Sequence, residues 1–201
     1  MKILSIDTSF GTSVAVLAND KVLAEINKPD PMSHAESIGS AIRDCLAKAD
    51  LKPVGIDRVV IGIGPGPFTG LRVGIAAAKF FAIGASAEIV GICSLDAIAF
   101  DYYNSGLEGK LLVETDARRK EHFWAVYQGL AAGVPKRVSG PSVAKPEEIE
   151  RSDLAQTKLL VTASALGKIA FHLGNKASTD LSPIYLREPD VSPSKGKKVS
   201  G

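Results

Sequence analysis

A block of glycines and prolines at residues 64–74 constrains the fold of this chain more than any other segment. It lies between an apolar run at 58–63 and another at 75–85, and it reads Gly-Pro-Gly-Pro-Phe-Thr-Gly-Leu-Arg-Val-Gly. The run before it is typical of a fully buried strand. The run after it predicts a helix that is apolar on almost every face. A stiff turn therefore joins a central strand to a helix that needs burial on more than one side.

The helix after this block carries a small residue at every fourth position. Such a ridge, formed by Gly70, Gly74, Ala78 and Ala82, lets a second helix approach closely. One face of the helix must lie on the sheet, so a second apolar face needs another helix, from this chain or from a partner. We favour a partner. The expected interface residues, including two from a helix at 33–49, are Ile38, Ile42, Gly70, Leu71, Arg72, Gly74, Ala78 and Phe81.

The block also invites comparison with phosphate-binding loops. A glycine-rich turn before a helix can hold a phosphate on free backbone amides, but Pro65 and Pro67 remove two of those amides. No lysine follows as in a P-loop, and Thr69 stands where a dinucleotide loop has its third glycine. We therefore predict a stiff turn with Thr69 as the helix cap. A phosphate site is the alternative.

The rest of the chain predicts a mixed α/β sheet. A hairpin at Asn19–Asp20 joins two early strands, and a Ser33–Glu36 capping box starts an amphipathic helix. Strands and helices then alternate in the order expected of a ribonuclease-H-like sheet. The expected strands are 2–7, 13–17, 22–26, 58–63, 88–92, 110–115, 122–127 and 158–161; the expected helices are 33–49, 70–85, 94–103 and 164–173; residues 131–146 show at best short strand-like pieces, and a disordered tail begins at Pro189.

Composition narrows the class of protein. The 24 basic and 22 acidic residues are scattered and leave a net charge of +2, which does not mark a nucleic-acid binder. Cys45 and Cys93 lie far apart without metal-site spacing, and this indicates reduced thiols. The amino terminus does not resemble a signal peptide, and no uncharged apolar run reaches the roughly 18 residues of a membrane span. We expect a cytoplasmic protein with no membrane partner.

The chemistry-bearing residues indicate no catalytic site. Asp7, with Thr8 and Ser9, ends the first strand as in the phosphate loop of the actin, Hsp70 and sugar-kinase superfamily, although an acid that caps a turn is the simpler interpretation. The three histidines have no i, i+4 partner and no paired Cys-x-x-Cys motif exists, so we expect no metal site. No nucleophile stands beside a recognisable base.

Five motifs, taken in order, resemble the TsaB (YeaZ) family of accessory proteins in bacterial tRNA N6-threonylcarbamoyladenosine biosynthesis. The resemblance covers residues 1 to about 188, and Pro67 replaces the family's usual serine. The motifs are Ile6-Asp7-Thr8-Ser9, Ser33-His34-Ala35-Glu36, the block at 64–74, Asp116-Ala117-Arg118-Arg119-Lys120-Glu121 and Tyr185-Leu186-Arg187.

The resemblance implies a fold, an activity and partners. The fold is that of an actin-like ATPase (ribonuclease-H-like), with a complete N-terminal subdomain at 1–103, a reduced second subdomain at 104–188 and a tail at 189–201. The catalytic relative TsaD holds a metal with two histidines four residues apart, and this chain has Ile38 four residues after His34. The resemblance therefore implies a non-catalytic scaffold. The scaffold would bind TsaD, together with the ATPase TsaE, for modification at position 37 of ANN-decoding tRNAs.

The resemblance also implies how these partners meet. Helices 33–49 and 70–85 would pack on TsaD as a four-helix bundle, and the same surface would form a homodimer when TsaD is absent. Transfer RNA would bind through the complex, and ATP or ADP at the subunit junction is a further implication. Alternatives are a stand-alone ATPase or sugar-kinase-like phosphotransferase using Asp7, a peptidase, and direct RNA binding through residues 118–120, which more commonly form a solvated charge run.

Overall fold

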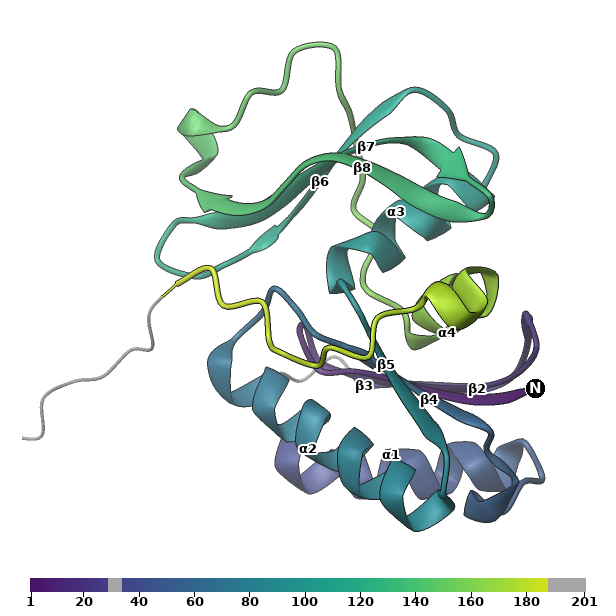
Figure 1. Cartoon of the computed structure of the whole chain (residues 1–201). Coiled ribbons are helices and arrows are strands. Elements are labelled where there is room, and N and C mark those ends of the chain that lie inside the picture. The colour runs from purple at the N-terminus through teal and green to yellow at the C-terminus, as the bar shows by residue number, and fades with distance from the viewer. Residues whose placement is uncertain (29–33, 188–201) are drawn as a thin grey trace, which may run out of the picture.

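The computed structural model describes residues 1–28 and 34–187 and shows two β-sheets stacked one above the other, with two helices between them (Figure 1). The lower sheet has the order β3-β2-β1-β4-β5, and the upper sheet has the order β8-β7-β6-β9. The lower sheet consists of β1 (Lys2–Asp7), β2 (Thr12–Ala18), β3 (Lys21–Lys28), β4 (Arg58–Gly62) and β5 (Glu88–Ile92). The upper sheet consists of β6 (Lys110–Asp116), β7 (His122–Ala131), β8 (Val134–Ala144) and β9 (Ala155–Gln156).

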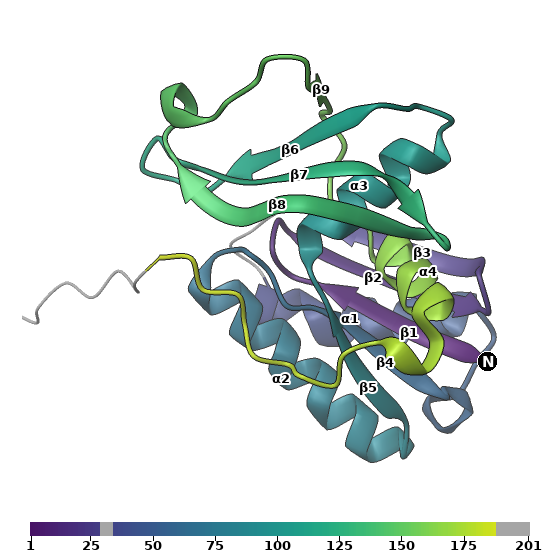
Figure 2. The ribbon, with the colours of Figure 1, turned by 45° about the horizontal axis from the view of Figure 1, so that its top comes forward.

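The helices form two layers around the lower sheet. α1 (His34–Lys48) and α2 (Phe68–Ala85) cover its outer face, and α3 (Ser94–Asn104) and α4 (Ala163–Leu173) lie between the two sheets (Figures 1 and 2). Short 3-10 turns occur at Pro53–Gly55, Pro146–Glu148 and Gly174–Lys176. The lower sheet is therefore buried on both faces, which explains the near-continuous apolar runs of its strands.

Strand directions in the lower sheet confirm the ribonuclease-H-like prediction. β1, β2 and β3 pair antiparallel, with the Asn19–Asp20 turn between β2 and β3, and β4 and β5 run parallel to β1. The side chains alternate between the two faces. Leu4 and Ile6 pack towards α1 and α2, while Ile3 packs towards α3 and α4.

The start of α2 corrects one prediction. The helix begins at Phe68 with Pro67 at the N-cap position, and no side chain caps it there. Thr69 therefore lies inside the first turn and is not the cap. Proline precedes the helix without loss because the first helical amides have no partner within the helix. The Ser33–Glu36 capping box includes a residue outside the described ranges, as does the tail predicted from Pro189.

Two further predictions in the second half are wrong. Residues 131–146 were expected to hold only short pieces, yet most of them form β8, an eleven-residue strand with register shifts against β7. Its prolines fit because β8 is an edge strand, where a missing amide costs no ladder bond. The apolar residues at 158–161 form no strand; β9 pairs with β6 at Ala155 and Gln156 instead.

The last described segment, residues 177–187, crosses the molecule as an extended strap (Figure 1). The amide of Gly91 donates to Ser178 O at 2.9 Å, and the amide of Ile184 donates to Ile63 O at 2.8 Å. At its end, Arg187 donates to the carbonyl of Ala117 in the β6–β7 turn. The strap therefore links the edge of the lower sheet to a turn of the upper sheet.

Candidate interaction surface

Asp7, at the end of β1, is closed off by side chains of its own chain. It is only 2% exposed. Ser9 donates to its Oδ1 from both the backbone amide, at 2.8 Å, and Oγ, at 2.5 Å. Ser94 Oγ donates to Oδ2 at 2.6 Å. Both carboxylate oxygens are thus engaged by neighbouring hydroxyls, with no open face towards a nucleotide.

The end of β4 and the glycine block pack directly on this loop. A Cβ placed at Gly62 would lie 1.9 Å from Asp7 Oδ2, and one placed at Gly66 would lie 2.8 Å from Ser9 Cβ. Thr8 is completely buried and its Oγ1 donates to the carbonyl of Gly70 at 2.8 Å. The glycines thus lie in direct contact with the residues of the Asp7 loop. This packing favours the stiff turn over the phosphate site.

The small-residue ridge of α2 faces the interior of the chain. Leu71 and Ala78 are fully buried, and a Cβ placed on Gly74 would lie 2.1 Å from Thr8 Oγ1. On α1, Ile38 and Ile42 are buried in the same core between the helices and the lower sheet. Of the eight expected interface residues, Arg72 is exposed, Phe81 is half-buried and the other six are buried within this chain. The single chain therefore leaves only Arg72 and Phe81 of this set accessible to a partner.

The outer face of α2 carries a different apolar surface. Phe80 and Ile83 are each 75% exposed. The residues on this face recur at helical spacing, and we name them the α2 stripe: Val73, Ala76, Ala77, Phe80, Ile83 and Gly84. By length and composition alone α2 would also qualify as a membrane span, which is weak evidence because its other face packs on β4. The sequence signal for the stripe was present, but it did not distinguish the inner face from the outer one.

A groove of about 590 Å³ runs beside the stripe, between α2 and the strap. Its walls carry Arg72 and Lys79 from α2 and residues 179–183 with Tyr185 from the strap. The Arg72 guanidinium lies 3.6 Å from the centre of the Phe68 ring, and its Nε donates to Tyr185 Oη at 3.0 Å. The Phe68 and Tyr185 rings are themselves in contact, with centroids 4.7 Å apart.

This groove leads to a point where three distant motifs meet. Phe68 and Arg72 come from the glycine block, Tyr185 and Arg187 come from the strap, and Arg187 forms an ion pair of 3.2 Å with Glu121 of the β6–β7 turn. The motifs are at least 42 residues apart in the chain. Sequence reasoning gave the motif at 185–187 no role and offered residues 118–120 only RNA binding or a solvated charge run. In the structure both motifs hold the strap.

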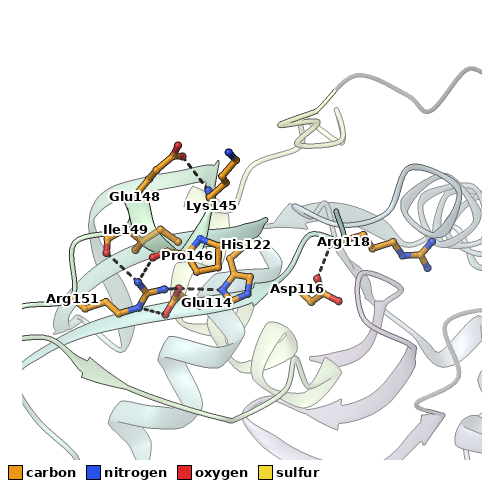
Figure 3. A network of polar contacts seen from close by, with 9 residues as sticks. All are labelled: Glu114, Asp116, Arg118, His122, Lys145, Pro146, Glu148, Ile149 and Arg151. Carbon is orange, nitrogen blue, oxygen red and sulfur yellow. Dashed lines mark hydrogen bonds and ion pairs between the residues drawn. The ribbon is translucent and has the colours of Figure 1, made fainter. Parts of the chain in front are cut away.

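A polar network on the upper sheet fixes the loop that follows β8 (Figure 3). Glu114 accepts from Arg151 Nη2 at 2.6 Å and lies 3.2 Å from His122 Nδ1. Arg151 also donates to the carbonyls of Pro146 and Ile149. The carboxylate and the guanidinium are therefore both engaged within the chain, and the network acts as a structural clamp.

The basic turn next to this network has a left-handed backbone. Arg118, Arg119 and Lys120 have φ values of 62°, 51° and 60°. The amide of Arg118 donates to Asp116 Oδ1 at 2.7 Å, as drawn in Figure 3. The charge run thus lies in a tight turn at the end of the β6–β7 hairpin, held by the strap through Arg187.

A buried polar cluster joins α3 to the upper sheet. Tyr127 Oη donates to Asp96 Oδ1 at 2.7 Å, and Arg137 Nη1 lies 3.4 Å from Cys93 Sγ. Burial raises the pKa of the Cys93 thiol to about 12 and also raises the pKa of Asp96, which Arg137 opposes. A neutral, buried thiol is a poor nucleophile. In the part of the chain that the structure describes, no group of three or more metal-ligating side chains lies together.

Comparison with known proteins assigns this chain to a family. Residues 28–182 match the family model of TsaD, tRNA N6-adenosine threonylcarbamoyltransferase. Among curated proteins, an uncharacterized protein of Mycobacterium leprae is 36% identical over 95% of this chain. The tRNA threonylcarbamoyladenosine biosynthesis protein TsaB of Escherichia coli is 31% identical over 73% of this chain. The chain belongs to the TsaD family, in its TsaB (YeaZ) branch.

Solved structures of this branch have the same fold. A Pseudomonas aeruginosa protein described as similar to peptidase YeaZ superposes with a TM-score of 0.81 at 24% identity, covering 92% of this chain and 99% of that one. The fold is therefore that of the YeaZ structures. This TsaB-family chain spans 56% of the length of the Mycobacterium leprae relative and 64% of the Escherichia coli TsaB.

Proposed function

We propose that this TsaB-family chain is a non-catalytic scaffold that binds TsaD, together with the ATPase TsaE, in the cytoplasm. In this role it supports formation of N6-threonylcarbamoyladenosine at position 37 of ANN-decoding tRNAs. The observation that carries the proposal is the α2 stripe, with Phe80 and Ile83 each 75% exposed on one helix face. Contiguous exposed apolar surface marks a protein-interaction site.

The energetics of the stripe support a partner. Burying one large apolar side chain is worth about 1.5–3 kcal/mol relative to leaving it in water. Two such side chains lie one turn apart on α2, surrounded by small residues that let another helix approach. The neighbouring outer face of α1 carries Gly39, where a Cβ would meet nothing within 4 Å, so a second helix also has room there.

The proposal also covers the homodimer, the bound tRNA and a bound nucleotide. In the absence of TsaD the α2 stripe would bind a second copy of the chain, since the same apolar surface is left to cover. Transfer RNA would bind through the complex. A bound ATP or ADP would lie at the subunit junction, because Asp7, Thr8 and Ser9 are buried within this chain.

The scaffold role is tested with Phe80→Asp and the TsaD of the same source. We expect the variant to unfold at the wild-type urea midpoint, because Phe80 is exposed, and to bind TsaD about 100-fold more weakly. Leu160→Asp is the matched control, because Leu160 is 67% exposed in the segment between β9 and α4. Calorimetry measures the affinity, and loss of modified tRNA in the reconstituted reaction measures the function.

Two outcomes would contradict the scaffold role. One is wild-type affinity for TsaD in the Phe80→Asp variant. The other is ATP turnover by the purified chain that Asp7→Asn abolishes, since this would establish the stand-alone phosphotransferase instead. The two hydrogen-bonded oxygens of Asp7 speak against that second outcome.

A further inference from the structure

Arg72 lies in the groove between α2 and the strap with its guanidinium already positioned. The ring of Phe68 covers one face at 3.6 Å, and Tyr185 Oη accepts the hydrogen of Nε. Within residues 1–28 and 34–187, the two terminal amino groups of Arg72 donate no hydrogen bond and form no ion pair. These contacts already fix the orientation of the Arg72 guanidinium. A further hydrogen bond to its terminal amino groups therefore costs little side-chain entropy.

The groove has an excess of positive charge. Its walls carry Arg72 and Lys79, whereas Asp180 is the carboxylate among the lining residues. Asp180 accepts the amide of Ser182 at 2.9 Å, and its hydrogen bonds to Ser182 lower its pKa, so it stays ionised beside Lys79. One carboxylate therefore faces two cations in the groove lining, which leaves a net positive charge for a ligand.

The groove is also continuous with the α2 stripe. Ala76 belongs to both, and Arg72 precedes Val73 of the stripe by one residue. An apolar centre with a charged rim is the usual anatomy of a protein interface. A helix that covers Val73 and Phe80 therefore brings its own neighbouring side chains to the mouth of the groove.

We propose that this groove receives an aspartate or glutamate side chain of the partner subunit that covers the α2 stripe, and that Arg72 binds its carboxylate through both terminal amino groups. This inference rests on the proposed function. It adds an ion pair to an otherwise apolar interface. Arg72 pairs with the acidic side chain, while Phe68 and Tyr185 hold Arg72 in place. A planar guanidinium matches a carboxylate in a two-bond geometry.

The test measures the affinity of the full chain for the TsaD of the same source, by calorimetry at low and high salt. We expect Arg72→Met to weaken binding about tenfold at low salt, and the loss to shrink at high salt because screening weakens the wild-type pair. Tyr185→Phe, which removes the hydroxyl and keeps the ring, should show a smaller loss of the same sign. Lys136→Met, which deletes an exposed charge on β8, is the matched control and should bind as wild type.

Each other outcome overturns the inference in a recognisable way. In one outcome, Arg72→Met binds TsaD with wild-type affinity and salt dependence, while Phe80→Asp binds weakly. This result would reject the acid-binding groove and leave the scaffold role intact. Wild-type affinity of both variants for TsaD would reject both the acid-binding groove and the scaffold role. The double variant Glu188→Gln/Asp190→Asn tests whether this chain's own acids fill the groove: tighter binding of TsaD by that variant would assign the groove to them.

Discussion

At the residue scale, Gly74 marks the tightest approach between α2 and the loop after β1. A Cβ at this position would lie 2.1 Å from Thr8 Oγ1 and 3.1 Å from Thr8 Cβ. Thr8 has no room to withdraw, because it is fully buried and its hydroxyl bonds the carbonyl of Gly70. Glycine is therefore required here by packing, since the space of a side chain is already occupied.

This contact predicts the effect of a single methyl group. Gly74→Ala should lower the free energy of unfolding by about 2–3 kcal/mol, because an overpacked core must shift backbone or break the Thr8 bond. Gly84→Ala, in the same helix, is the control: a Cβ there meets nothing within 4 Å, so helix propensity should raise stability by up to about 1 kcal/mol. Urea denaturation measures both. Equal effects at the two positions would contradict the packing argument.

At the element scale, α4 is fixed to the lower sheet through its carboxyl end. Arg58 of β4 is 5% exposed and donates to the carbonyls of Ala170, at 3.4 Å, and Gly174, at 3.0 Å. Its other side pairs with Glu88 of β5 at 2.8 Å. One side chain thus adds a charged donor to two carbonyls that also accept the backbone amides of Gly174 and Ala177. It ties two strands to the helix that covers them.

Removing this guanidinium should destabilise the chain while leaving the α2 stripe unchanged. We expect Arg58→Met to lower the free energy of unfolding by about 2 kcal/mol, since the charged hydrogen bonds to two carbonyls and to Glu88 are lost together. Arg43→Met is the comparison, because the exposed Arg43–Asp44 pair on α1 contributes less than about 1 kcal/mol. Thermal unfolding followed by circular dichroism separates the two. A loss for Arg43→Met as large as that for Arg58→Met would refute this account.

At the scale of the whole molecule, α3 and α4 form the layer on which both sheets pack. One core lies on each side of the lower sheet, and the core that includes α3 and α4 extends into the upper sheet (Figure 2). The cluster of Cys93, Asp96, Tyr127 and Arg137 lies in this shared layer. A change in the protonation of these side chains therefore affects the stability of the layer between the two sheets.

The Cys93 thiol predicts a loss of stability in alkali. Its pKa rises from 9.0 to about 12 on folding, so the folded state favours the protonated thiol. This contribution is complete below pH 9, which is the unfolded pKa, and is lost as the pH rises towards 12. Between pH 7.5 and pH 10 we expect the stability difference between wild type and Cys93→Ala to change by about 1.4 kcal/mol against the wild type. Denaturant titrations at the two pH values measure it, and an unchanged difference would show that the thiol is not shielded.

The sequence alone was sufficient for the order and type of the strands and α-helices from β1 to β7. Periodicity and turn residues predicted β1 and β5 to the residue, and the glycine block predicted a rigid connection into an apolar helix. These features are local: strand alternation, helix spacing and proline geometry act within a few residues. The strand at 134–144 escaped prediction because its prolines are tolerated only at a sheet edge, and edge position is a property of the assembled sheet.

The tertiary structure alone decided which face of α2 is free and which motifs meet. Helical spacing groups Gly70, Gly74 and Ala78 on one face and Phe80 and Ile83 on another, but it does not say which of these faces packs on the sheet. The close approach of Thr8 settles that point, because only glycine leaves room for it. In the same way, Arg72 and Tyr185 lie 113 residues apart in the chain and come together only because the strap crosses α2. Local patterns determine what a segment becomes, whereas long-range packing determines what it faces.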